Sequence, residues 1–155
     1  MIPQLPILSI AIAGAALYSQ VEATKLEIQP LNNSEITNGT CFDFERQNPK
    51  GRSPIIFSYN YDTKIGYLRI NGKLLTLKLV SDKGVRTGEF QGQRRLEWVG
   101  EGAKVEIYCR SFVPEELKNY PDQESIEVSW VKGSMTVYMN NGRSTIKVVG
   151  IYGAR

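Results

Sequence analysis

Residues 67–80, with the sequence YLRINGKLLTLKLV, decide the fold class of this chain. Two runs rich in apolar residues, 67–70 and 73–80, are joined by Asn71-Gly72. Asn-Gly between two such runs predicts a β-hairpin, because both residues tolerate the positive φ angles of a type I′ turn. The segment therefore favours an antiparallel sheet.

Similar short runs separated by turn residues occupy most of the chain on both sides of this hairpin. A proline followed by two glutamates at 114–116 predicts a short helical turn. The pattern as a whole predicts an all-β fold, a small antiparallel β-barrel or sandwich of about eight strands with one short helical turn. Further strands are expected at 26–28, 40–45, 55–61, 89–90, 96–98, 103–110, 125–131, 135–139 and 144–151, and the longer loops at 30–39, 47–54 and 81–88.

The first 23 residues, MIPQLPILSIAIAGAALYSQVEA, have the features of an export signal. Their apolar run is shorter than the roughly 20 residues that a membrane-spanning helix needs. It ends in Val21-Glu22-Ala23, a small-x-small pattern typical of a signal-peptidase site. The sequence thus predicts a cleaved signal peptide at 1–23 and a single all-β domain at 24–155, exported to the periplasm or the medium, without stable membrane insertion after cleavage. An uncleaved anchor helix is the alternative.

Two cysteines, Cys41 and Cys109, lie in the predicted mature domain. An even pair in an oxidising compartment favours one disulfide. Cys109 alternates in phase with apolar residues and is expected to face inward, whereas Cys41 is out of phase with Phe42 and Phe44. A bridge would therefore be easiest at a strand end or beside a bulge. Two separate buried thiols are the alternative.

Histidine is absent from the chain, and this absence narrows the function classes. Nucleophilic sites that use a histidine base cannot be built, and the commonest neutral metal ligand is missing. We expect no enzyme activity, no metal and no cofactor; a hydrolase based on two carboxylates is a distant alternative. The net charge of +3 is too mild to predict nucleic-acid binding.

The middle of the chain resembles the membrane-bound and periplasmic inhibitors of C-type lysozyme. The resemblance covers about residues 40–110 and rests on the hairpin at 67–78, Gly84-Val85-Arg86, Trp98 and Gly102-Ala103. It implies an exported β-barrel closed by a disulfide between an early and a late strand, a role that Cys41 and Cys109 would fill.

The same resemblance implies a binding function with a lysozyme as one partner. The loop at 81–87 would face that partner, with Lys83 or Arg86 offered as a cation to an acidic cleft and Trp98 as a further contact. The alternative is an extracytoplasmic structural or envelope-associated module without inhibitory activity.

Overall fold

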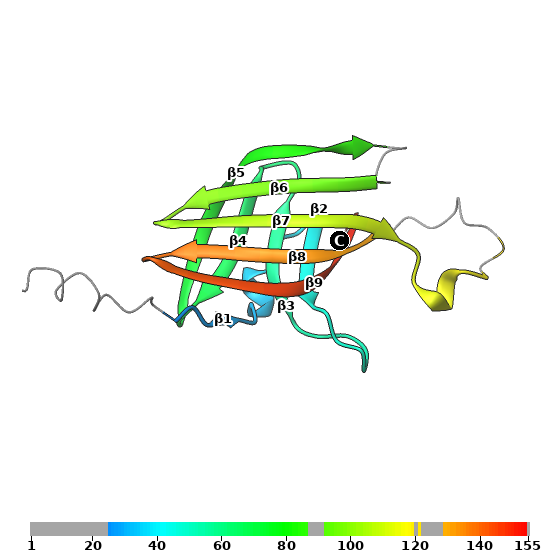
Figure 1. The fold of residues 1–155 in the computed structure, drawn as a ribbon, viewed down its shortest axis with the longest axis horizontal. Coiled ribbons are helices and arrows are strands. Elements are labelled where there is room, and N and C mark those ends of the chain that lie inside the picture. Colours follow the sequence, from blue (N-terminus) through cyan, green and yellow to red (C-terminus); the bar gives the residue numbers. More distant parts are fainter. Residues whose placement is uncertain (1–24, 87–91, 120, 122–128, 155) are drawn as a thin grey trace, which may run out of the picture.

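The computed structural model describes residues 25–86, 92–119, 121 and 129–154, and the predicted leader and its cleavage site lie outside these residues. Nine antiparallel strands form one sheet (Figure 1). They are β1 (Ile28–Gln29), β2 (Thr40–Arg46), β3 (Ile55–Asn60), β4 (Ile65–Ile70), β5 (Lys73–Arg86), β6 (Gly92–Gly100), β7 (Ala103–Phe112), β8 (Ser129–Met139) and β9 (Gly142–Ala154). Two short 3₁₀ turns, Asn33–Glu35 and Glu115–Leu117, are also present.

Eight of the strands close into a barrel in which sequence neighbours are also neighbours in space. The chain runs from β2 to β9, and β9 then pairs with β2 to complete the circle. Strand β1 is additional, and within the described ranges it pairs with the end of β4 alone. The prediction of an all-β fold of about eight strands with a short helical turn is confirmed, and the architecture is the barrel rather than the sandwich.

Tight turns connect three of the hairpins. Asn71 and Gly72 have φ angles of 49° and 83°, as the predicted type I′ turn requires. The turns at 101–102 and 140–141 also have positive φ at both residues. Asn and Gly adopt this backbone readily, and Glu101 is the one member of these turns that does not favour it. The strands on either side of each turn keep one continuous register.

The barrel interior is filled by side chains from alternate strand positions, with aromatic rings at its centre. Trp98 packs against Phe57 and Tyr59, with ring centroids 4.8 Å and 5.1 Å apart. Phe42 and Phe44 stack with centroids 4.6 Å apart on the inner side of β2. A Cβ at Gly150 would come within 2.7 Å of both rings, so glycine at this position makes room for them.

The outer face of β2, β3 and β4 is covered by the segment that precedes β2. Thr37 donates its backbone N–H to Ser58 Oγ at 3.1 Å, and Leu31 donates its N–H to the carbonyl of Ile55 at 2.8 Å. Beneath this segment, Ser58 donates a hydrogen bond of 2.6 Å to the buried carboxylate of Asp43. The covering segment and the neighbouring strand thus supply hydrogen-bond partners to Ser58 and Asp43, although the buried Arg69 Nε on β4 has none.

The predicted disulfide is not formed, and both cysteines are buried free thiols. Cys109 belongs to the barrel interior, whereas Cys41 lies on the outer side of β2 beneath the covering segment, where its thiol donates to the carbonyls of Thr37 and Gly39. A disulfide needs Cβ atoms about 4 Å apart, which side chains on opposite faces of the barrel wall do not provide. The expected phase difference between the two cysteines is therefore present, and no bulge removes it.

The prediction of a loop at 81–88 is wrong for residues 81–86, because β5 continues to Arg86. The β5–β6 register shifts between Leu79 and Ser81, and Val80 becomes 54% exposed. This bulge reverses the inward phase of the strand. Asp82 then pairs in register with the inward Leu96, so a polar stretch that reads as a loop forms barrel wall.

Candidate functional site

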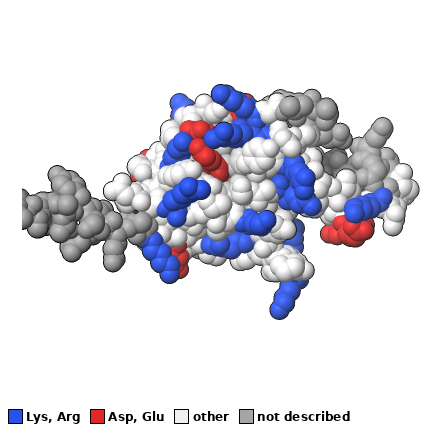
Figure 2. All heavy atoms as spheres, in the orientation of Figure 1, with Lys and Arg blue, Asp and Glu red and all other residues white. Residues whose placement is uncertain are grey.

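The outer surface of β5 to β9 carries most of the exposed positive charge on this side of the molecule (Figure 2). Strand register brings its members into cross-strand rows, because residues paired in register point to the same side of the sheet. We call this surface the basic face. It consists of Lys83, Arg95, Lys104, Arg110, Lys132, Arg143 and Lys147.

Two pairs of like charges lie directly opposite each other on the basic face. Lys83 on β5 pairs with Arg95 on β6, and Arg110 on β7 pairs with Lys132 on β8. Like charges in this arrangement destabilise a sheet by up to about 1 kcal/mol per pair. Their presence therefore calls for a reason other than folding stability.

Acidic side chains neutralise only one end of the basic face. Lys104 Nζ lies 2.9 Å from Glu106 and 3.6 Å from Glu97, and Arg95 lies 3.7 Å from Glu106. The hydrogen bond from Lys104 lowers the pKa of Glu106 and raises that of Lys104. Among the described residues, no carboxylate forms an ion pair with Lys83, Arg110, Lys132, Arg143 or Lys147.

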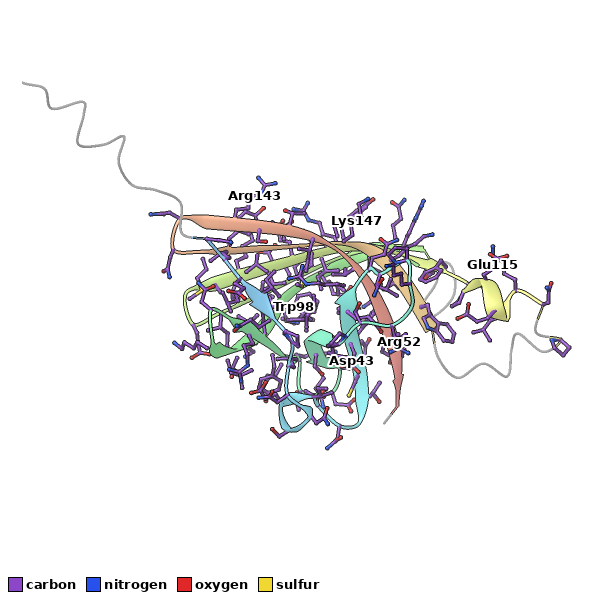
Figure 3. The ribbon with its side chains drawn as sticks, turned by 90° about the horizontal axis from the view of Figure 1, so that it is seen from below. Asp43, Arg52, Trp98, Glu115, Arg143 and Lys147 are labelled. Carbon is purple, nitrogen blue, oxygen red and sulfur yellow. The ribbon has the colours of Figure 1, made fainter. Side chains whose placement is uncertain are left out.

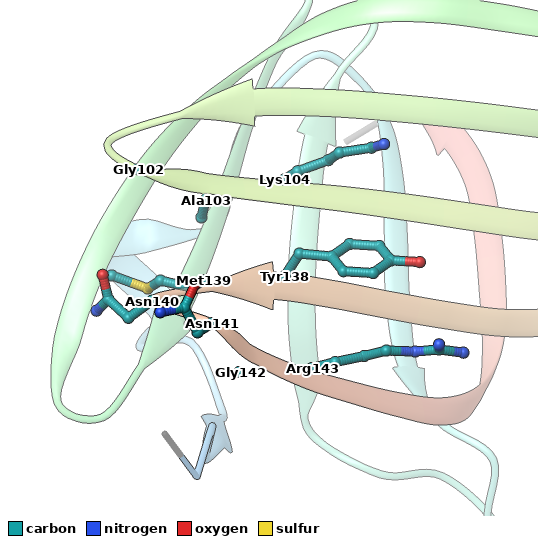
Figure 4. A pocket seen from close by; sticks show the side chains of 9 residues that line it. All are labelled: Gly102, Ala103, Lys104, Tyr138, Met139, Asn140, Asn141, Gly142 and Arg143. Atoms are coloured by element: carbon teal, nitrogen blue, oxygen red, sulfur yellow. The ribbon is translucent and has the colours of Figure 1, made fainter. Parts of the chain in front are cut away.

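Three cations of the basic face make cation–π contacts with aromatic rings. Tyr138 lies between Lys104 and Arg143, whose charged ends are 5.5 Å and 5.8 Å from the ring centroid (Figure 4). Lys132 Nζ lies 5.0 Å from the centroid of Phe112. Such contacts hold a cation at a defined place while leaving it accessible. In Figure 3, Arg143 and Lys147 project outward from β9.

Two shallow depressions hollow the basic face. One, of about 280 Å³, lies over the middle of β7, β8 and β9, between Arg95 and Tyr138. The other, of about 490 Å³, lies at the turn at 140–141. Both are lined by Tyr138 and Arg143, so the two depressions adjoin at these residues.

A second polar cluster lies inside the barrel. Arg94 Nη2 contacts Asp82 Oδ2 at 2.7 Å, and the Arg94 side chain is only 6% exposed. Desolvation by burial raises the pKa of Tyr59 to about 12 and that of Cys109 to about 11. The ion pair lets Asp82, in the polar half of β5, lie on the inner side of the wall, and we assign it a structural role.

The structure separates the predicted partner-binding residues. Lys83 is exposed and belongs to the basic face, whereas Trp98 is fully buried inside the barrel, as Figure 3 shows. A partner that stays outside the barrel therefore does not contact the Trp98 indole. Arg86 ends β5, and its side chain lies outside the described residues, as does loop residue 87.

The rest of the basic face was not predicted from the sequence, although a signal for it was present. Lys104, Glu106, Tyr108 and Arg110 alternate with the buried residues of β7, and Arg143, Thr145 and Lys147 do so on β9. Reading only the outward positions of each strand would have shown the excess of cations. Which strands become neighbours, and in which register, could not be read in this way.

Comparisons give this site no precedent: no family model, no curated protein and no solved structure matches the chain. Among the described residues, no group of three or more cysteine and acidic side chains is placed to hold a metal ion. The described part of the chain also contains no helix long and apolar enough to cross a membrane.

Proposed function

We propose that this protein is a non-catalytic binding protein that holds an acidic partner against its basic face. The observation that supports the proposal is the pairing of like charges, Lys83 with Arg95 and Arg110 with Lys132, on an open sheet surface. A partner that carries negative charge would relieve this repulsion, and the gain would appear as binding free energy.

The arrangement of the cations supports the same proposal. They are distributed over five neighbouring strands instead of lining one deep pocket. A surface of this kind suits an extended or repeating anionic partner, and attraction between opposite charges would speed the encounter. The predicted export would place the binding function outside the cytoplasm.

A lysozyme is the narrower partner that the family resemblance suggests. Lys83 is available for it, but this residue lies within β5 and not on a protruding loop. Inhibition would then require the barrel wall to cover the acidic cleft. Unchanged activity of a C-type lysozyme at a large excess of this protein would exclude that partner and leave the broader proposal intact.

Charge reversal tests the broader proposal. Lys132→Glu combined with Lys147→Glu should weaken binding to immobilised polyglutamate by about 10-fold or more in 50 mM salt. The matched control is Lys25→Glu with Lys50→Glu, which makes the same change in net charge at exposed positions away from β5 to β9. Equal losses in both double variants would show that net charge, and not the basic face, is responsible.

A further inference from the structure

Strand β9 has a free edge along its first half. It pairs with β2 from Val148 to Ala154, and the last bond on this side joins the N–H of Gln47 to the carbonyl of Lys147 at 2.9 Å. Within the described ranges, no strand pairs with this side of β9 between Gly142 and Lys147, although β8 pairs with the other side throughout. A free edge of this kind is a template for one more strand.

Alternate residues of β9 direct their backbone groups to this edge. Successive residues of an antiparallel strand turn their N–H and C=O groups alternately toward its two neighbours. Because the carbonyl of Lys147 faces β2, the N–H and C=O groups of Thr145 and Arg143 face the same side. The side chains of these three residues are exposed on the outer side of the wall, where the hydroxyl of Thr145 bonds to that of Thr136 at 2.9 Å. An antiparallel strand that continues the line of β2 would therefore bond to Thr145 and Arg143.

The charge beside this edge favours an acidic strand. A side chain opposite Thr145 on an added strand would have Arg143 and Lys147 as its diagonal neighbours. Neither cation forms an ion pair with a carboxylate among the described residues. Glu106 lies in the same cross-strand row as Thr145, but it is two strands further in and pairs with Lys104. At about 4.8 Å between strands, an added carboxylate would be roughly 14 Å from Glu106, which exceeds the Debye length of about 8 Å at physiological salt.

The same charge argues against a second copy of this chain as the occupant. Antiparallel pairing of two free edges about Thr145 would place Arg143 of each copy opposite Lys147 of the other. Like charges directly opposite each other destabilise a sheet. Charged side chains on an exposed strand are also a common means of preventing edge-to-edge pairing. The edge therefore discriminates between another copy, which it repels, and an acidic strand, which it attracts.

The inner side of the edge favours apolar side chains. Ile146 packs against the core but is only partly buried, and Ser144 beside it is also half-buried. The side chains of an added strand alternate between the two faces of the sheet. Acidic residues opposite Thr145 and Arg143 would thus be interleaved with apolar residues beside Ile146 and Ser144.

We infer that the free edge of β9 binds an extended peptide segment, in which acidic and apolar residues alternate, as an added antiparallel strand. This inference rests on the proposed function, since it specifies the acidic partner of the basic face. The segment would lie opposite residues 142–146, because Gln47 occupies the position opposite Lys147. Backbone bonds to Arg143 and Thr145 would hold it in register, and its carboxylates would contact the side chains of Arg143 and Lys147.

The test uses a dye-labelled, end-capped peptide of sequence Val-Glu-Val-Glu-Val and its isomer Glu-Glu-Val-Val-Val, which has the same composition and charge. Fluorescence anisotropy with the full chain measures both. We expect the alternating peptide to bind at least about 10-fold more tightly than the isomer. Methylation of its two glutamate backbone nitrogens, which would face β9, should weaken binding by about 10-fold or more. Methylation of two valine nitrogens, which would face away, should change it by less than about 2-fold.

A pair of variants tests the same edge from the side of the protein. Thr145→Pro removes an N–H that points to the free edge and is not used by β8, so it should weaken binding of the alternating peptide by about 10-fold. Thr145→Val is the matched control, because it loses the hydroxyl and keeps the N–H, and it should bind within about 2-fold of the unaltered protein. Circular dichroism melting establishes that the barrel is intact in both. If Thr145→Pro does not fold, the methylated peptides still decide.

The other outcomes separate the two proposals. Equal binding of both isomers, insensitive to methylation but lost on charge reversal of the basic face, would overturn strand addition and support the broader function. A dimer in sedimentation experiments that Thr145→Pro dissociates would also overturn the inference, because a second copy would then occupy the edge. No binding of either peptide or of polyglutamate would overturn both proposals.

Discussion

The two walls of this barrel differ in whether the charged groups on their outer face are paired within the chain. On the wall formed by β2, β3 and β4, the segments at 31–39 and 47–54 cover the sheet, and Glu45 accepts hydrogen bonds of 2.6 Å from both Arg52 and Ser53. The wall formed by β6 to β9 has no such cover among the described residues and presents like charges side by side. On the covered wall the carboxylates of Asp43 and Glu45 accept hydrogen bonds from within the chain, whereas the open wall leaves cations available to a partner.

Alkylation of the two cysteines tests the comparison with an all-or-none result. Cys41 lies under the covering segment and Cys109 lies inside the barrel. We expect both thiols to resist alkylation in the native protein and both to react after unfolding without reductant. Mass spectrometry counts the labels. An unfolded, unreduced protein that takes up no label would contradict the placement of the cysteines on opposite faces.

Matched serine substitutions should produce the next largest difference. Ser58→Ala removes the donor to the buried carboxylate of Asp43, and we expect the free energy of unfolding to fall by about 2 kcal/mol. Ser134→Ala on the open wall should change it by about 0.5 kcal/mol or less. Urea denaturation measures both variants. Similar losses on the two walls would mean that the cover does not isolate Asp43 from water.

Stability should fall as the pH rises from about 9 to about 11. Burial raises the pKa of Cys109 to about 11 from the ordinary 9.0, so the unfolded chain releases this proton at lower pH than the folded chain does. The folded state then binds more protons, and the free energy of unfolding decreases with pH, by about 1–2 kcal/mol. Tyr59, whose pKa is raised to about 12, extends the decrease upward. Cys109→Ala should flatten the slope between pH 9 and 10, and an unaltered slope would argue against this assignment.

The smallest expected effect has the opposite sign. Arg110→Gln removes one member of the like-charged pair with Lys132, and we expect the barrel to become more stable by about 0.5 kcal/mol. Lys104→Gln, which removes a cation paired with Glu106, should instead lower the melting temperature. Thermal melts at low salt compare the two. A loss of stability in Arg110→Gln would remove the energetic argument for a partner.

Much of the local structure was predictable because it depends on neighbouring residues. Asn71-Gly72 favours a type I′ turn independently of the rest of the chain. Alternation of apolar and polar residues along β7 predicts which of its side chains point inward. The bulge after Leu79 was not predictable in this way. Asp82 is tolerated on the inner side because Arg94, twelve residues away in sequence, lies on the next strand to pair with it.

The candidate site shows the same limit of prediction from local sequence. Lys83 was selected from the sequence as a loop cation, but its contribution depends on Arg95 lying beside it on β6. Neither residue carries a signal for the other, because hydrophobic alternation specifies the face of a side chain and leaves its cross-strand partner open.

The sequence alone determined that this chain forms short antiparallel strands with tight turns, because propensity and alternation act over a few residues. Only the tertiary structure decided that the strands close into a barrel, that no disulfide joins the two cysteines, and that scattered cations become one basic face. Those properties depend on register and closure, which bring together residues that are distant in sequence.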